Sequence, residues 1–354
     1  MTDLFVPFSL GPLQLDNRLV MAPLTRNRAG EGEAPTALAA EYYAQRASAG
    51  LIVSEGTQPS AVGQGYPHTP GLHTDGQVEG WRLVADAVHA AGGLIVAQLM
   101  HAGRIGHQNI TGLQPVAPSP ITPAGEVYTE QGMTAFEAPR ALGTDELPGV
   151  VAEFVDAARR AIDAGLDGVE LHAANGYLLQ QFLSDSTNHR TDSYGGSPEN
   201  RARFVIEVAT AVTAAIGADR VGIRISPGGT FNDIAETETA VTYRALLEGL
   251  APLGLLYLHV LEGAETDFRT ALRAQWDGPV IVNTGFGGPS DLATAQATVD
   301  NGQADMFCIG RPFLANPDLV ERLRTGAELN EPDPSTFYAG GARGCTDYPA
   351  LQPA

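Results

Sequence analysis

The segment Val169–Gly196, "VELHAANGYLLQQFLSDSTNHRTDSYGG", starts as a short apolar strand and then runs into a cluster of polar and aromatic residues. Similar apolar runs, rich in Val, Ile and Leu and bounded by glycine or polar residues, recur at 18–25, 50–57, 93–100, 220–227, 255–262, 278–285 and 304–311. Segments with helical periodicity lie between them, at 81–91, 147–164, 200–216, 237–250 and 290–300. Buried strands that alternate with amphipathic helices predict a parallel sheet covered on both faces.

Eight strand–helix units in 354 residues predict an α/β fold of the TIM (β/α)₈ type. No Ser- or Gly-rich linker divides the chain, so we expect residues 1–354 to form a single barrel domain. A doubly wound open sheet is the alternative, but no strand is followed by the Gly-x-Gly-x-x-Gly pattern of dinucleotide-binding folds. Residues 5–17 predict a small hairpin that closes the barrel bottom. Residues 102–144, after the third strand, predict a lid-like insertion.

Charge and composition exclude several classes of function. A formal net charge of -20 repels nucleic-acid backbones and anionic membranes, and no local basic patch offsets it. All 21 basic residues are arginine. This excludes a Schiff-base aldolase, a pyridoxal-phosphate enzyme and a P-loop, because each of them needs a lysine. Any bound phosphate must therefore be held by arginine and backbone N–H groups.

The two cysteines, Cys308 and Cys345, are too few for a disulfide framework and lack metal-ligand spacing. Cys308 lies in an apolar run and is expected in the core. The N-terminal residues show no basic head before an apolar stretch, and no segment has the uncharged apolar length that a membrane span needs. We therefore expect a cytoplasmic monomer or homodimer that acts on small molecules, with no nucleic-acid or membrane partner.

In a TIM barrel, the residues at the carboxyl ends of the strands carry the chemistry. Here they are mostly hydrogen-bond donors, in the order Thr25, Arg26, Glu55, Gly56, Gln98, His101, His172, Asn175, Arg224, His259, Glu262, Asn283 and Arg311. A hydrolase with two acids would use Glu55 and Glu262, but their strands are not adjacent. A metal site on the histidines at 101, 172 and 259 lacks a local His-x-His or carboxylate partner. We interpret His259 as a structural group.

The loops after the last two strands are candidates for a phosphate site. "NTGFGG" follows the seventh strand and "IGRPF" includes the end of the eighth. The backbone N–H groups of Gly285 and Gly310 and the guanidinium of Arg311 are the available donors. Taken alone, the two glycines fit simple turns equally well.

Several motifs together resemble the classical branch of the Old Yellow Enzyme family of flavin-dependent ene-reductases. The most specific is "HAANGYLLQQFLSDSTNHRTDSYGGSPENRARF" at 172–204. The others run in order over nearly the whole chain: "MAPLTR", "AQLMHAGR", "RISPGGTFNDI", "GRPFLANPDL" and "YAGGARGCTDYP". The resemblance implies a TIM barrel that binds FMN non-covalently, takes electrons from NADPH or NADH and reduces an activated alkene.

The resemblance also implies roles for individual residues. His172 and Asn175 would bind the substrate's carbonyl or nitro oxygen, and Tyr177 would be the proton donor. Two neutral donors suit an oxygen on which negative charge develops, and a tyrosine with a pKa of about 10 keeps its proton at neutral pH. The expected contacts to FMN are Pro23, Leu24, Thr25, Gly56, Gln98, Arg224, Gly285, Phe286, Gly310 and Arg311.

Three positions bear on the substrate pocket. Met100 stands where many relatives have a bulky tryptophan, and Cys345 stands where the tail motif usually has a tyrosine. Both, together with Tyr66, are expected to line the pocket. Two other readings remain open: a nitroester or nitroaromatic reductase that uses the same His172 and Asn175 pair, and a cofactor-free barrel that only binds a ligand.

Overall fold

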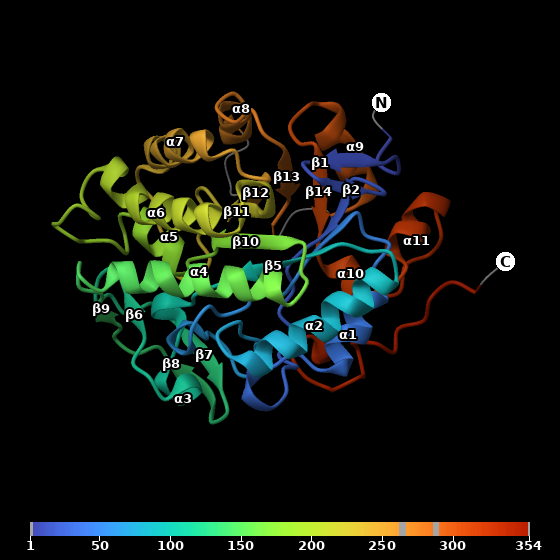
Figure 1. The fold of residues 1–354 in the computed structure, drawn as a ribbon, viewed down its shortest axis with the longest axis horizontal. Coiled ribbons are helices and arrows are strands. Elements are labelled where there is room, and N and C mark those ends of the chain that lie inside the picture. The colour runs from blue at the N-terminus through green and yellow to red at the C-terminus, as the bar shows by residue number, and fades with distance from the viewer. Residues whose placement is uncertain (1–2, 262–266, 286–289, 353–354) are drawn as a thin grey trace.

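The structure, a computed structural model, describes residues 3–261, 267–285 and 290–352. Within these residues, eight parallel strands close into a barrel (Figure 1). They are β3 (Leu19–Met21), β4 (Leu51–Val53), β5 (Ile95–Leu99), β10 (Gly168–Ala173), β11 (Val221–Ile225), β12 (Tyr257–Leu261), β13 (Val280–Asn283) and β14 (Met306–Ile309). Each strand falls inside one of the apolar runs. The predicted TIM (β/α)₈ barrel is therefore confirmed.

Helices cover the outside of the barrel (Figure 1). Those that periodicity predicted are α2 (Asp75–Ala90), α4 (Leu147–Asp163), α6 (Pro198–Ile216), α7 (Thr239–Leu250) and α9 (Leu292–Asp300). The helix α2 begins six residues before the predicted start at 81, because Thr74 and Gln77 form a capping box.

Short helices were not predicted, because few turns show little periodicity. These are α1 (Ala37–Ala44), α5 (Leu178–Leu183), α8 (Asp267–Arg273), α10 (Arg311–Ala315) and α11 (Leu319–Thr325). Single 3₁₀ turns lie at Glu31–Glu33, Ala61–Gly63, Ala218–Arg220, Ala251–Leu253 and Pro334–Thr336.

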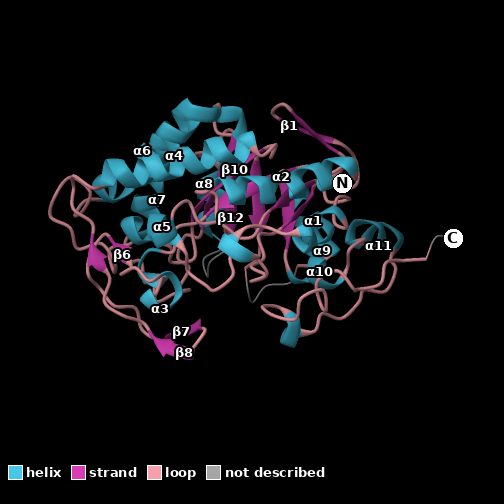
Figure 2. Ribbon diagram, turned by 60° about the horizontal axis from the view of Figure 1, so that its bottom comes forward, coloured by secondary structure: helices cyan, strands magenta, loops and turns pink. Residues whose placement is uncertain are grey.

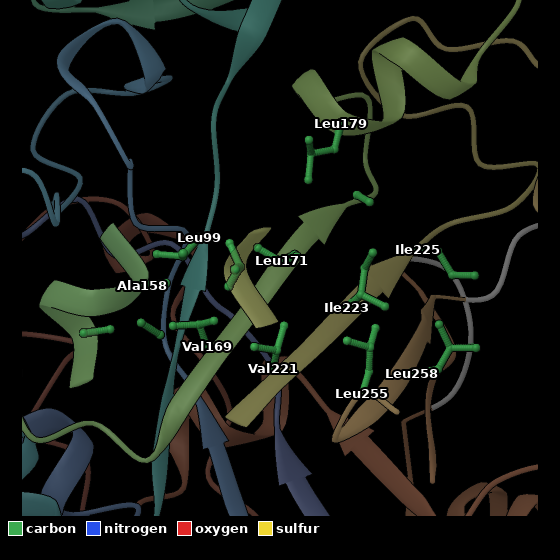
Figure 3. Packing of buried hydrophobic residues seen from close by; sticks show 14 of the residues in the cluster. Leu99, Ala158, Val169, Leu171, Leu179, Val221, Ile223, Ile225, Leu255 and Leu258 are labelled. Carbon is green, nitrogen blue, oxygen red and sulfur yellow. The ribbon is translucent and has the colours of Figure 1, made fainter. Parts of the chain in front are cut away.

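The strand β10 carries apolar side chains outward and polar ones inward. Every residue of β10 is buried. Val169 and Leu171 lie in the main hydrophobic cluster together with Ala158 of α4 (Figure 3). Successive side chains of a strand point to opposite faces, so Glu170 and His172 point into the barrel. The alternation therefore places polar groups in an interior that apolar layers surround.

The predicted N-terminal hairpin is present. Its strands, β1 (Phe8–Leu10) and β2 (Leu13–Leu15), pair in the antiparallel sense. Leu10 and Leu15 are buried in a cluster with residues from the barrel strands, among them Val20 and Val96. These apolar contacts close the bottom of the barrel.

The insertion after β5 has secondary structure of its own. It contains a 3₁₀ turn at Gly103–Ile105, α3 (Gln108–Thr111), β6 (Val116–Ala117), β7 (Glu126–Thr129), β8 (Gly132–Ala135) and β9 (Arg140–Ala141). The hairpin of β7 and β8 stands away from the barrel (Figure 2). Arg104 ties the base of the insertion to the loop after β11, because its Nη2 donates to the carbonyls of Asn232 (3.1 Å) and Asp233 (2.6 Å). Movement of the insertion as a lid stays a prediction.

Candidate active site

Polar side chains meet at the carboxyl half of neighbouring barrel strands. His172 of β10 is in register with Arg224 of β11, and Arg224 is in register with His259 of β12. One level lower, Glu170 is in register with Gln98 of β5. All five residues are buried. Closure of the barrel thus brings together strand-end residues that are far apart along the chain.

A tight turn between β10 and α5 orients Asn175 and Tyr177. The φ angles of Asn175 (57°) and Gly176 (75°) lie in the left-handed region, which Asn and Gly tolerate best. Asn232 Nδ2 donates to the Asn175 carbonyl at 2.8 Å and so braces the turn. The turn brings the Tyr177 ring edge-on to that of His172, with 5.1 Å between the ring centroids.

Burial sets the protonation states of the catalytic candidates. It raises the pKa of Tyr177 well above the ordinary value, and the neighbouring Tyr66, whose hydroxyl lies 2.9 Å away, raises it further. Burial also lowers the pKa of His172 well below its ordinary value, and the positive charge of Arg224 adds to that effect. At neutral pH Tyr177 therefore keeps its proton and His172 is a neutral imidazole.

A buried carboxylate orients one of the expected flavin contacts. Glu170 accepts hydrogen bonds from Gln98 Nε2 at 2.7 Å and from His259 Nδ1 at 2.8 Å. Burial by itself raises the pKa of Glu170, but His259, Arg224 and Gln98 outweigh it, and the pKa falls to about 2. Because the Gln98 amide nitrogen is held in this way, its oxygen is left to accept from a ligand. The contact of His259 agrees with its interpretation as a structural group.

The expected flavin contacts offer donors and close backbone approaches that fit FMN. Arg224 Nε and His172 Nδ1 are buried and have no hydrogen-bond partner among the described residues. At Gly56, an added Cβ would lie 2.6 Å from Met100 Sδ, so a larger residue there would force the Met100 side chain to move. The Arg224 guanidinium and the unpaired His172 nitrogen can donate hydrogen bonds, and the Gln98 amide oxygen can accept one. This set matches the polar edge of a flavin ring, which presents both acceptors and an N–H group.

The loops expected to hold the phosphate lie side by side. Gly285 follows β13 and has a φ of 75°, while Gly310 follows β14 and immediately precedes Arg311. An added Cβ at Gly310 would lie 3.9 Å from Leu24 Cδ2. Gly310 is therefore next to the segment after β3 that contains Pro23, Leu24 and Thr25. The predicted contact at Phe286 lies outside the described residues, as does Glu262.

Two of the three predicted pocket residues lie beside Tyr177. Tyr66 reaches it through the hydroxyl contact already described. Met100 is buried in one hydrophobic cluster with Tyr177, Ile105 and, at its edge, Phe136 of the insertion.

Cys345 lies in a different hydrophobic cluster from Tyr177 and Met100. It is buried in the main core and borders a small cavity that Arg26, Tyr42 and Glu55 also line. Arg46 Nη2 donates to its carbonyl at 3.3 Å, which holds this part of the tail inward. The role of Cys345 in the substrate pocket stays a prediction.

Two residues near Tyr177 were missed by the reading of the sequence. Asn232 makes a side-chain hydrogen bond to both Tyr66 and Tyr177, which lowers the pKa of each. Tyr338 in the tail is close enough that its phenol raises both pKa values. Both residues stand in motifs that carried the family resemblance, "RISPGGTFNDI" and "YAGGARGCTDYP", so the motifs themselves were the available signal.

Among the described residues, no group of three or more His, Cys, Asp or Glu side chains could hold a metal ion. In the same part of the chain, no helix combines the length and apolar character needed to cross a membrane.

Comparison with known proteins gives consistent matches over the whole fold. A model of the NADH:flavin oxidoreductase / NADH oxidase family matches residues 3–330. The chain is 43% identical over 363 aligned positions to 12-oxophytodienoate reductase 1 of Oryza sativa subsp. japonica, which covers 99% of this chain and 93% of that protein. It is 42% identical over 359 positions to a probable flavin mononucleotide-dependent alkene reductase of Leishmania infantum, covering 98% and 96% respectively.

Solved structures match equally well. The Old Yellow Enzyme homologue from Zymomonas mobilis has a TM-score of 0.95 and 43% identity, with 99% of this chain and 100% of that chain covered. Morphinone reductase in complex with tetrahydroNAD has a TM-score of 0.95 and 48% identity, with 99% and 98% covered.

Proposed function

The chain belongs to the NADH:flavin oxidoreductase / NADH oxidase family, and we propose that it reduces the C=C bond of activated alkenes with FMN as cofactor and NADPH or NADH as reductant. The substrates would be α,β-unsaturated ketones and aldehydes, maleimides and nitroalkenes. One observation carries the proposal: neutral His172, Asn175 and protonated Tyr177 lie together beside buried donors that fit a flavin.

His172 and Asn175 are proposed to bind the activating oxygen of the alkene. When bound and reduced by the nicotinamide, FMN would supply the hydride that is added to the β-carbon. Negative charge then grows on the oxygen, so neutral N–H donors aimed at it stabilise the transition state more than the bound substrate. A neutral His172 suits this role, because a charged imidazolium would also bind anions in the ground state.

Tyr177 is proposed to give its proton to the α-carbon. Its raised pKa keeps the hydroxyl protonated until the carbon becomes basic enough to accept the proton. Tyr66 can return a proton, since the two hydroxyls are 2.9 Å apart. Asn232 donates toward the phenol oxygen and would stabilise the tyrosinate left after transfer.

The cofactor is proposed to be held by three groups of residues. Gln98 and Arg224 would contact the pyrimidine edge of the ring, and Pro23, Leu24, Thr25 and Gly56 would line it. Gly285, Phe286, Gly310 and Arg311 would hold the phosphate. We further propose that residues 1–354 act as a single domain, as a monomer or homodimer.

Absorbance of the purified protein tests this function. The protein should be yellow, should bleach under NADPH and should recover when 2-cyclohexenone is added. A colourless protein that cannot be loaded with FMN would refute the proposal. Faster turnover of a nitrate ester than of the enone would instead favour a nitroester reductase on the same site.

A further inference from the structure

One guanidinium lies at the centre of a loop near the C-terminus, Thr336–Arg343, which we call the tail loop. Arg28 donates to five backbone carbonyls of this loop. The acceptors are those of Thr336 (2.8 Å), Phe337 (3.2 Å), Ala339 (2.5 Å), Gly341 (2.7 Å) and Arg343 (3.2 Å). A guanidinium suits such a cage because its planar fork presents five N–H donors, whereas an ammonium is a single point charge.

The rest of the tail loop gains little from apolar burial. Residues 338–343 are all exposed to solvent. Gly340 and Gly341 have φ angles of 108° and 59°, which an ordinary residue rarely adopts. The order of this segment therefore depends on how its carbonyls are satisfied.

The carbonyls from 339 to 344 form an alternating set. Those at 339, 341 and 343 bind Arg28. The Gly340 carbonyl accepts from the Arg343 backbone N–H at 3.1 Å, and the Ala342 carbonyl from that of Cys345 at 3.0 Å. Arg26 Nη2 donates a hydrogen bond to the Gly344 carbonyl at 2.7 Å. Removing Arg28 would therefore take away the hydrogen-bond donor of the carbonyls at 339, 341 and 343.

The tail loop lies on the same face of the barrel as the proposed substrate pocket, because Arg28 holds it there. Arg28 lies three residues after Thr25, in the segment that follows β3, so the cage is built on the catalytic face. Tyr338 stands between two of the carbonyls that Arg28 holds, and it is 62% exposed. Its phenol acts on Tyr66 and Tyr177, as described above. Its backbone is therefore fixed while its side chain is free to meet a ligand.

We propose that Arg28 is a positioning residue that holds the tail loop, with Tyr338, at the mouth of the pocket and so determines the affinity for the alkene. The anchoring of the loop is independent of the reaction. Only the effect on alkene affinity rests on the proposed function.

Limited proteolysis of the FMN-loaded protein tests the anchoring. Every basic residue is arginine, so trypsin can cut only after arginine, and Arg343 lies in the tail loop. In Arg28→Met, cleavage after Arg343, followed by intact mass, should be at least about tenfold faster than in wild type, because several charge-assisted hydrogen bonds are lost. Arg28→Lys should fall between the two, and it provides a folded variant if Arg28→Met is unstable.

Arg82→Met is the matched control, since Arg82 is an exposed residue of α2 that pairs only with Glu79 in the contacts described. It should leave cleavage after Arg343 unchanged. An equal cleavage rate in wild type, Arg28→Met and Arg28→Lys would overturn the anchoring.

Steady-state kinetics test the consequence for the substrate. If the tail loop is in place in only a fraction of the molecules, the apparent affinity for the substrate falls by that fraction. In Arg28→Met, the KM for 2-cyclohexenone should therefore rise about tenfold, with kcat nearly unchanged. Tyr338→Ala should raise KM without faster cleavage. Faster cleavage with an unchanged KM would overturn the role in substrate affinity. If wild type itself reduces no alkene, the proposed function fails while the proteolysis result still decides the anchoring.

Discussion

Glu55 is the most informative position for a test of stability, because it is a carboxyl group buried between two of the segments expected to hold FMN. Its Oε2 accepts the backbone N–H of Arg26 at 2.9 Å, and its own N–H donates to the Tyr43 hydroxyl at 2.9 Å. Glu55 precedes Gly56, and Arg26 follows Thr25. We consider the substitution Glu55→Gln, which keeps the shape of the side chain and removes its titration.

The expected magnitude follows from the pKa. Burial raises the pKa of Glu55 from 4.5 to about 7, although hydrogen bonding and the charge of Arg26 oppose the rise. The folded protein therefore holds this proton more tightly than the unfolded chain. That contribution is fully present below pH 4.5 and is lost as pH rises through 7. Between pH 5 and pH 8 the loss amounts to about 2.5 kcal/mol of the free energy of unfolding.

Urea unfolding of the FMN-loaded protein at pH 5 and pH 8 measures this loss. From pH 5 to pH 8, the free energy of unfolding should fall by about 2.5 kcal/mol more in wild type than in Glu55→Gln, because the two proteins share all other titrating groups. Glu79→Gln, at a side chain that is 70% exposed, is the control and should follow wild type. An equal loss of unfolding free energy in wild type and Glu55→Gln would contradict this prediction, because it would mean that Glu55 is not protonated preferentially in the folded protein.

Three further predictions concern the site itself. Tyr177→Phe should slow alkene reduction by about 10²–10⁴-fold and leave flavin reduction by NADPH largely intact; stopped-flow absorbance separates the half-reactions, and equal losses would contradict the role of proton donor. Gly56→Ala should weaken FMN binding, because the new Cβ would lie 2.6 Å from Met100 Sδ; fluorescence titration should then show partial recovery on adding Met100→Ala. The pKa of Glu170 is lowered from 4.5 to about 2, so its contribution to stability is present above pH 4.5 and is lost as pH falls toward 2. A plot of Tm against pH should therefore be flatter below pH 4.5 in Glu170→Gln than in wild type, and equally steep curves would argue against an ionised Glu170.

The fold was predictable because its signals are local. Each barrel strand needs only a short apolar run with boundaries, and α4 needs only the helical period of its side chains. The start of α2 was missed because the capping box at Thr74 lies in a polar stretch where periodicity is weak. The site was predictable where one motif contains its residues, since His172, Asn175 and Tyr177 lie within six residues at the end of β10 and in the turn that follows it.

Contacts between distant parts of the chain could not be predicted in this way. Both Cys345 and Tyr338 lie in the tail motif, and the sequence suggested that Cys345 lines the pocket. The structure buries Cys345 beside Arg46 and leaves Tyr338 exposed. Which side of a loop faces inward depends on the groups that its carbonyls meet, and those groups are about 300 residues away.

The alternation of strands and helices, the polar character of the strand ends and the exclusion of lysine chemistry all follow from local sequence. Each of these is a property of residues next to one another, which short-range sterics and side-chain period control. The tertiary structure alone decided that Glu170 fixes Gln98, that Asn232 supports Asn175, and that Arg28 gathers the tail loop. Those contacts exist only after the barrel closes, because closure is what brings their elements within hydrogen-bond distance.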